Sequence, residues 1–74
     1  MEDPVRAIGA EMAKADYDGG YRTLPSDDAA EGCVYPPLKR RLGVQSRTDP
    51  RVSLAIDAYH HKFINLLAHS RRRS

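Results

Sequence analysis

Apolar residues recur with helical spacing near the start of the chain. They lie three, four and three positions apart: Val5, Ile8, Met12 and Ala15. Asp3 can cap a helix and Pro4 suits the first helical position, whereas Asp18-Gly19-Gly20 suits its end. We therefore expect an N-terminal helix between these signals. Gly9 costs it up to ~1 kcal/mol relative to alanine, so either the helix is weak there or a neighbouring element packs closely.

A second and stronger helical pattern occupies the C-terminal third. Its apolar positions alternate spacings of four and three: Val52, Ile56, Tyr59, Phe63 and Leu66. Ala55, Ile64 and Leu67 widen this stripe beyond a strict coiled-coil seam. Thr48-Asp49-Pro50 repeats the cap-then-proline start. The pattern predicts a helix from about Pro50 to Ser70 that forms the core of the protein.

Proline and glycine divide the middle of the sequence. Ser26 to Glu31 predicts one short helix that stops at Gly32, and Leu38 to Leu42 predicts another that begins at Pro36-Pro37 and ends at Gly43. Cys33-Val34-Tyr35 is compatible with an extended segment, but no partner strand is evident.

The predicted fold is a single all-α domain of residues 1–74. The long C-terminal helix packs on the N-terminal helix, with one or two short helices between them. Residues 71–74 are expected to form a disordered basic tail. A 74-residue chain buries only about 60% of its unfolded surface, so every apolar face is needed for stability.

Composition narrows the class of protein. The single Cys33 cannot form an internal disulfide, and no Cys/His cluster has zinc-site spacing, so neither a metal nor another cofactor is expected. The N-terminal residues lack the pattern of a secretory signal, and no apolar run approaches the ~20 residues of a membrane span. We expect a cytoplasmic protein without membrane contact.

Charge is distributed unevenly along the chain. Residues 1–37 carry eight acidic and three basic side chains, whereas residues 38–74 carry nine basic and two acidic ones. Eight of the basic residues are candidates for contact with a partner or with nucleic acid: Lys39, Arg40, Arg41, Arg47, Arg51, Arg71, Arg72 and Arg73. Arginine suits phosphate because its planar fork donates several hydrogen bonds. The alternative is that the two halves neutralise each other within the fold.

The sequence gives little support for a metal site, a catalytic group or a helix-turn-helix. His60, His61 and His69 do not complete a metal pattern, and Asp57, four residues before His61, supplies one further group at most. Cys33 has no base in a local motif, and Asp27-Asp28 suits the start of a helix. An enzyme is therefore not expected. A helix-turn-helix around Gly43 is disfavoured because Asp49-Pro50 restarts the helix too late.

Four short segments resemble the central part of the Q-type antitermination proteins of lambdoid phages. They are Ser26-Asp27-Asp28-Ala29, Cys33-Val34, Leu38-Lys39-Arg40-Arg41 and Ile56-Asp57-Ala58-Tyr59-His60. The resemblance covers about half of the chain and implies action on bacterial RNA polymerase. That family is longer, its central helix lacks the Pro36-Pro37 interruption, and its downstream helix-turn-helix region has no counterpart here.

These observations lead to three functional hypotheses. The first is a small non-enzymatic regulatory protein of phage or bacterial type that binds RNA polymerase or another nucleoprotein complex through its basic residues, with contact to the nucleic-acid backbone. The second is a protein-protein module or inhibitor, including a homodimer, that pairs through the C-terminal helix with Tyr59 and Phe63 as anchors. The third is a direct DNA-binding protein.

Overall fold

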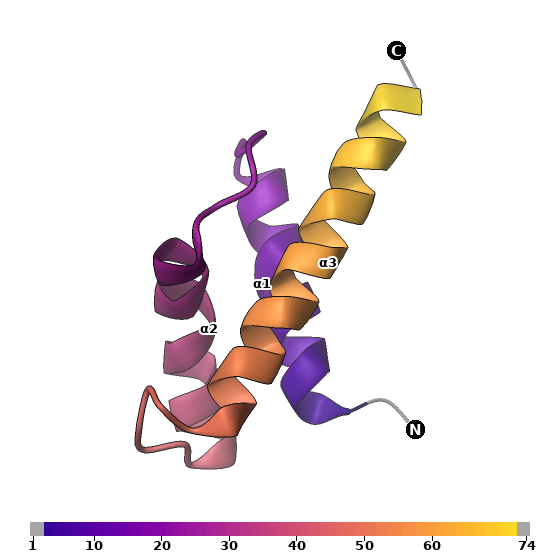
Figure 1. The fold of residues 1–74 in the computed structure, drawn as a ribbon. Coiled ribbons are helices and arrows are strands. Elements are labelled where there is room, and N and C mark those ends of the chain that lie inside the picture. Colours follow the sequence, from indigo (N-terminus) through magenta and orange to yellow (C-terminus); the bar gives the residue numbers. More distant parts are fainter. Residues whose placement is uncertain (1–2, 73–74) are drawn as a thin grey trace.

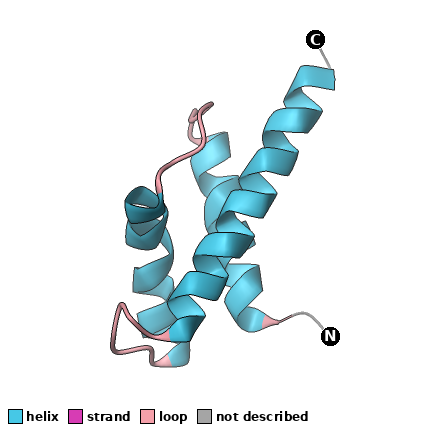
Figure 2. Cartoon of the chain, viewed as in Figure 1, coloured by secondary structure: helices cyan, strands magenta, loops and turns pink. Residues whose placement is uncertain are grey.

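The computed structural model describes residues 3–72, with side chains described as far as residue 70. Three helices form: α1 (Pro4–Asp18), α2 (Asp27–Leu42) and α3 (Pro50–Arg72). Figure 2 shows that the rest of the described chain is loop, without a strand between residues 3 and 72. Helix α1 crosses behind α3, and α2 lies on one side of the crossing (Figure 1). The long C-terminal helix packs mainly on α1, which confirms the predicted all-α architecture.

Helix α1 begins and ends where local chemistry predicts. The Asp3 carboxylate accepts a hydrogen bond from the Val5 N–H at 2.9 Å, and Pro4 needs no partner for its missing N–H. The chain leaves the helix through Gly19 and Gly20, and Gly20 has a φ of 115° that favours glycine. Ala13 is buried, whereas the predicted core position Ala15 is exposed.

Gly9 marks the point where α1 and α3 cross. A Cβ at this position would overlap the backbone carbonyl oxygen of Ala55 and would lie 3.0 Å from both the Ala58 Cβ and the Tyr59 nitrogen. Of the two explanations expected for Gly9, the close approach of a neighbour is therefore the one that the structure shows. Ala55 and Ala58 are buried beside this contact, where only small side chains fit.

Helix α2 corrects the prediction for the middle of the chain. It is one helix of 16 residues, so it replaces the two expected short helices, and Cys33-Val34-Tyr35 is helical rather than extended. Pro36 and Pro37 lie inside it, although each removes a backbone hydrogen bond. The compensation is burial of one face in the core: Ala30, Val34, Pro37 and Leu38.

The two ends of α2 are capped as the sequence indicates. The Ser26 hydroxyl accepts a hydrogen bond from the Ala29 N–H at 3.2 Å. Gly43 adopts a left-handed conformation with φ of 71°, and its N–H donates to the Lys39 carbonyl at 3.1 Å. Gly32, expected to stop a helix, is instead an exposed mid-helix residue.

Helix α3 supplies the two largest buried side chains of the core. Tyr59 and Phe63 have no exposed surface, and their rings stack with centroids 5.9 Å apart. The Tyr17 ring of α1 packs edge-on against the Phe63 ring, with centroids 6.0 Å apart. Ile64, predicted to widen the buried stripe, is instead 52% exposed. The helix extends to Arg72, two residues beyond the predicted end, so the expected tail begins within it. Residues 73–74 lie outside the described part of the chain.

Candidate functional site

Five of the eight candidate basic residues gather where α2 ends and α3 begins. We call this set the basic pole: Lys39, Arg40, Arg41, Arg47 and Arg51. It lies at the lower end of the molecule in Figure 1. Three of its residues lie in the last turn of α2, one in the 43–49 connection and one at the start of α3, because Gly43 turns the chain and the connection returns it to α3. The structure therefore brings together residues spread over 13 positions of sequence, from Lys39 to Arg51.

Arg41 is held by the N-terminal helix. Its two terminal nitrogens donate to the two carboxylate oxygens of Glu11 at 3.0 and 3.1 Å, which is a bidentate ion pair. Hydrogen bonding by Arg41, together with its charge, lowers the pKa of the Glu11 carboxyl. Both side chains are about half exposed, so this pair positions Arg41 without contributing much stability.

Arg47 is held by α2. Its guanidinium lies over the Tyr35 ring, 4.5 Å from the ring centre, and donates to the Glu31 carboxylate at 3.2 Å. Stacking and ion pairing together fix a side chain that would otherwise be mobile on the 43–49 loop. The Arg47 side chain nevertheless remains 58% exposed, so one face stays open to a partner.

Arg51 completes the start of α3. The Asp49 carboxylate accepts hydrogen bonds from the Arg51 backbone N–H at 2.9 Å and from its guanidinium at 2.8 Å. These bonds from Arg51 lower the pKa of Asp49 to about 2. The predicted cap-then-proline start is thus present, and Arg51 doubles as the partner of the capping carboxylate.

Lys39 and Arg40 differ from these three arginines. Both are exposed on the last turn of α2, and neither forms an ion pair with any residue whose side chain the structure describes. The basic pole contains five cations against three partner carboxylates, an excess of two positive charges. Carboxylates of the same chain therefore neutralise Arg41, Arg47 and Arg51, whereas the charges of Lys39 and Arg40 are not neutralised by a described side chain.

The remaining candidate arginines are not part of the basic pole. Arg71 and Arg72 belong to the last turn of α3, at the other end of that helix, and their side chains are not described. Arg73 lies outside the described residues. The length of α3 therefore separates Arg71 and Arg72 from the basic pole, so the candidate basic residues fall into two sets.

The proposed helix interface of α3 serves this chain's own core. Val52, Tyr59 and Phe63 are buried, whereas Ile56 and Leu66 are half-buried. Tyr59 and Phe63 have no exposed surface, so they are not free to anchor a second helix in this conformation. The seven-residue connection 43–49 is also longer than the three or four residues of a helix-turn-helix.

Cys33 takes part in a polar contact that no local sequence motif indicates. Asp16 of α1 accepts hydrogen bonds from the Cys33 thiol at 3.1 Å and from the Tyr59 hydroxyl at 2.6 Å. Burial and the Asp16 carboxylate raise the pKa of Cys33 to about 11, and they raise the pKa of Tyr59 as well. The thiol is therefore protonated near neutrality and is a poor nucleophile.

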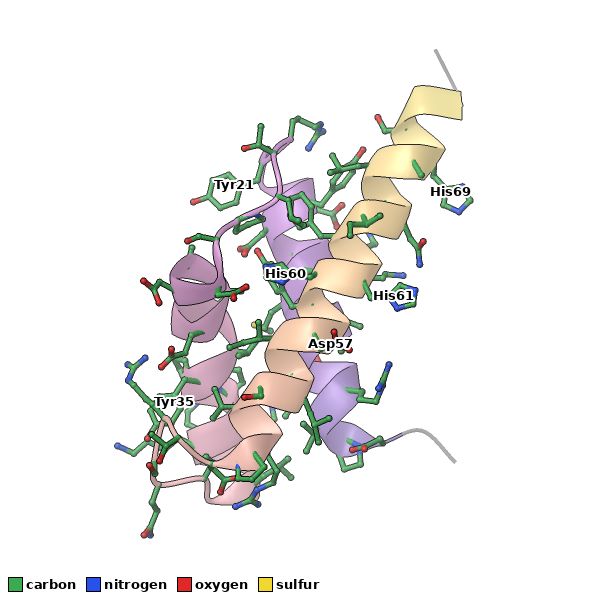
Figure 3. The ribbon with its side chains drawn as sticks, viewed as in Figure 1. Tyr21, Tyr35, Asp57, His60, His61 and His69 are labelled. Atoms are coloured by element: carbon green, nitrogen blue, oxygen red, sulfur yellow. The ribbon has the colours of Figure 1, made fainter. Side chains whose placement is uncertain are left out.

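The adjacent histidines point to different sides of α3, as helical geometry requires (Figure 3). His60 is half-buried, and its ring Nε2–H donates to the Pro25 carbonyl at 2.9 Å, while Nδ1 lies 3.5 Å from Asp27. His61 is exposed on the opposite side and His69 is exposed near the helix end. No group of three or more His, Cys, Asp or Glu side chains in the described region is placed to hold a metal ion.

None of the helices in residues 3–72 is long and apolar enough to cross a membrane. Comparison of this chain with protein-family models, with curated proteins and with solved structures found no match. The resemblance to the Q-type antitermination proteins therefore stays a prediction.

Proposed function

We propose that this chain is a small non-enzymatic regulatory protein that binds a nucleoprotein machine such as RNA polymerase through the basic pole. The observation that carries the proposal is the exposed pair Lys39 and Arg40, which has no ionic partner in the described structure. Unpaired cations at one end of a small protein are suited to an anionic surface, because they can form ion pairs on binding without breaking internal ones.

The three held arginines add orientation to this charge. Binding orders mobile side chains at a cost of about 0.5–1.5 kcal/mol each, and part of this cost is already met where a guanidinium is fixed. Arg41 and Arg47 are fixed by Glu11 and by Glu31 with Tyr35, yet both remain exposed. They therefore support a contact whose geometry is largely preformed.

A regulatory rather than catalytic role is favoured by the chemistry of the reactive groups. The Cys33 thiol is kept protonated beside Asp16, and His60 is engaged by the Pro25 carbonyl. The Asp16 carboxylate lies within hydrogen-bond distance of the Cys33 thiol, but it raises the pKa of that thiol and so does not activate it as a nucleophile. The protein is thus proposed to act by binding alone.

Charge reversal at the free pair tests the proposal. We expect Lys39→Glu/Arg40→Glu to weaken capture of bacterial RNA polymerase by at least tenfold, with helicity by far-ultraviolet circular dichroism unchanged. Lys14→Glu/Arg22→Glu is the matched control, because it makes the same change in charge elsewhere. Capture is compared with and without nuclease, since loss of binding after nuclease would indicate a direct nucleic-acid binder instead.

Equal capture of polymerase by the Lys39→Glu/Arg40→Glu variant and by the native chain would contradict the proposed role of the basic pole. Failure of the native chain to retain polymerase under either condition would contradict the proposed partner.

A further inference from the structure

A hollow lies between α1 and α3 on the side of their crossing that α2 does not cover. We call it the α1/α3 groove, and its lining comes from both helices: Asp3, Arg6, Ala10, Ala58, His61, Lys62 and Asn65. Figure 3 shows His61 directed away from α2, whereas His60 is directed toward the α1–α2 side. The groove is therefore separate from the basic pole.

Small residues at the helix crossing create this groove. Ala10 and Ala58 line it; Ala10 follows Gly9 directly, and Ala58 lies one turn after Ala55. Beyond the crossing the two helix axes diverge, and no third helix in the described structure fills the space between them (Figure 1). The result is a shallow depression that admits part of a ligand and leaves the rest in solvent.

Hydrogen-bond donors dominate the rim of the groove. Arg6 comes from α1, while His61, Lys62 and Asn65 come from two successive turns of α3. Arginine, lysine and asparagine side chains together present many N–H donors from opposite walls. Asp3 is the one carboxylate in the lining, and it already accepts the Val5 N–H as the cap of α1. Asp57, one turn before His61, lines a different hollow together with His60.

The cations of the groove also lack internal partners. Lys14 and Arg22 of the N-terminal half are engaged by Asp18 and by the Tyr17 ring, and three arginines of the basic pole are engaged by carboxylates. Arg6 and Lys62 form no ion pair with any described side chain. Within the described part, cations without a partner therefore occur at two places, the basic pole and this groove.

We propose that the α1/α3 groove binds a phosphoryl group. Arg6 and Lys62 supply the positive charge from opposite walls, and the His61 and Asn65 side chains add hydrogen bonds that orient the anion. The open, shallow form suits either free phosphate or a phosphate of a nucleic-acid backbone that continues into solvent. This site is additional to the basic pole and does not depend on the function proposed for that pole.

Nuclear magnetic resonance titration of the full chain tests this proposal. The probes are inorganic phosphate, a short oligo-dT strand and, as an anion of different chemistry, a glutamate peptide. We expect phosphate or oligo-dT to shift the Asn65 side-chain amide and the His61 ring signals. The first probe reports a free-phosphate site and the second a backbone site.

Substitution separates the groove from general charge. Arg6→Gln/Lys62→Gln is expected to weaken binding at least tenfold, whereas Lys14→Gln/Arg22→Gln, which removes the same charge elsewhere, is expected to leave it within twofold. For oligo-dT, loss of one phosphate contact should make the slope of log affinity against log salt shallower by about 0.7. Asn65→Ala keeps the charge and should still weaken binding, because one donor is lost.

Three results would overturn the proposal. They are the absence of Asn65 and His61 shifts with both phosphate probes, equal weakening in the groove and control double variants, and equal shifts with the glutamate peptide and with phosphate. Circular dichroism of each variant shows that the comparison is made between folded chains.

Discussion

Two glycines inside helices have opposite structural roles. Gly9 is buried where the backbones of α1 and α3 meet, so a methyl group there would meet the Ala55 carbonyl. Gly32 lies on the outer side of α2, where an added Cβ would meet nothing within 4 Å. The first glycine is required by packing and the second is not, although both carry the same intrinsic cost in a helix.

Alanine at each position is expected to change stability in opposite directions. Gly9→Ala should lower the free energy of unfolding by about 1–3 kcal/mol, because overpacking of the crossing outweighs the gain in helix propensity. Gly32→Ala should raise it by up to about 1 kcal/mol. Urea unfolding followed by circular dichroism measures both, and a stabilised Gly9→Ala variant would refute the close crossing.

At the scale of elements, α2 shows why the middle of the chain was the hardest part to predict. The outer helices carry caps, prolines and apolar spacing that agree with one another, so their starts were predicted correctly. In α2 the local signals of Gly32, Pro36 and Pro37 oppose a helix, and burial of Val34 and Leu38 overrides them. That burial depends on contacts with distant residues, which local patterns do not contain.

Replacement of the two prolines tests this account of α2. Pro36→Ala should restore an N–H that can donate to the Gly32 carbonyl and should stabilise the protein by about 1–2 kcal/mol, after allowance for a more flexible unfolded chain. Pro37→Ala should gain less, because Pro37 is buried and its ring contributes to the core. Thermal unfolding of both variants provides the comparison, and a loss of stability on Pro36→Ala would contradict it.

The candidate sites show a similar division. The basic residues of α2 and of the 43–49 loop were visible in the sequence because they are close together. Their pairing with Glu11 and Glu31 was not, since these carboxylates lie 30 and 16 positions away from Arg41 and Arg47.

The groove residues Arg6 and Lys62 were missed because they too are far apart in the sequence. Gly9 was the one local sign that their helices would meet.

At the scale of the whole molecule, the Asp16 carboxylate connects all three helices. It accepts hydrogen bonds from Cys33 on α2 and from Tyr59 on α3, and it belongs to α1 itself. A polar contact of this kind favours one arrangement of the helices, because any shift in register would leave the carboxylate without donors. The thiol of Cys33 therefore reports on the packing of the entire fold.

Thiol chemistry makes this dependence measurable. With a pKa of about 11 instead of 9.0, Cys33 should react with a disulfide reagent at pH 8 about 100-fold more slowly in the folded chain than in urea. Because folding raises the pKa of Cys33, the folded chain favours the protonated thiol. The stability that this thiol contributes is complete below pH 9 and is lost as pH rises toward 11. The free energy of unfolding should therefore fall between pH 9 and pH 11 more for the native chain than for Cys33→Ala. Equal pH profiles of the two chains would count against the contact.

The length of α3 has a consequence for any partner that the two basic sets share. Twenty residues separate Arg51 from Arg71 on this one helix, which places their backbones about 30 Å apart. Electrostatic influence in physiological salt decays over about 8 Å, so the two sets act as independent charges. α3 thus sets the distance between the two sets, and a partner with anionic sites at a matching separation would bind bivalently, with an avidity that neither end provides alone.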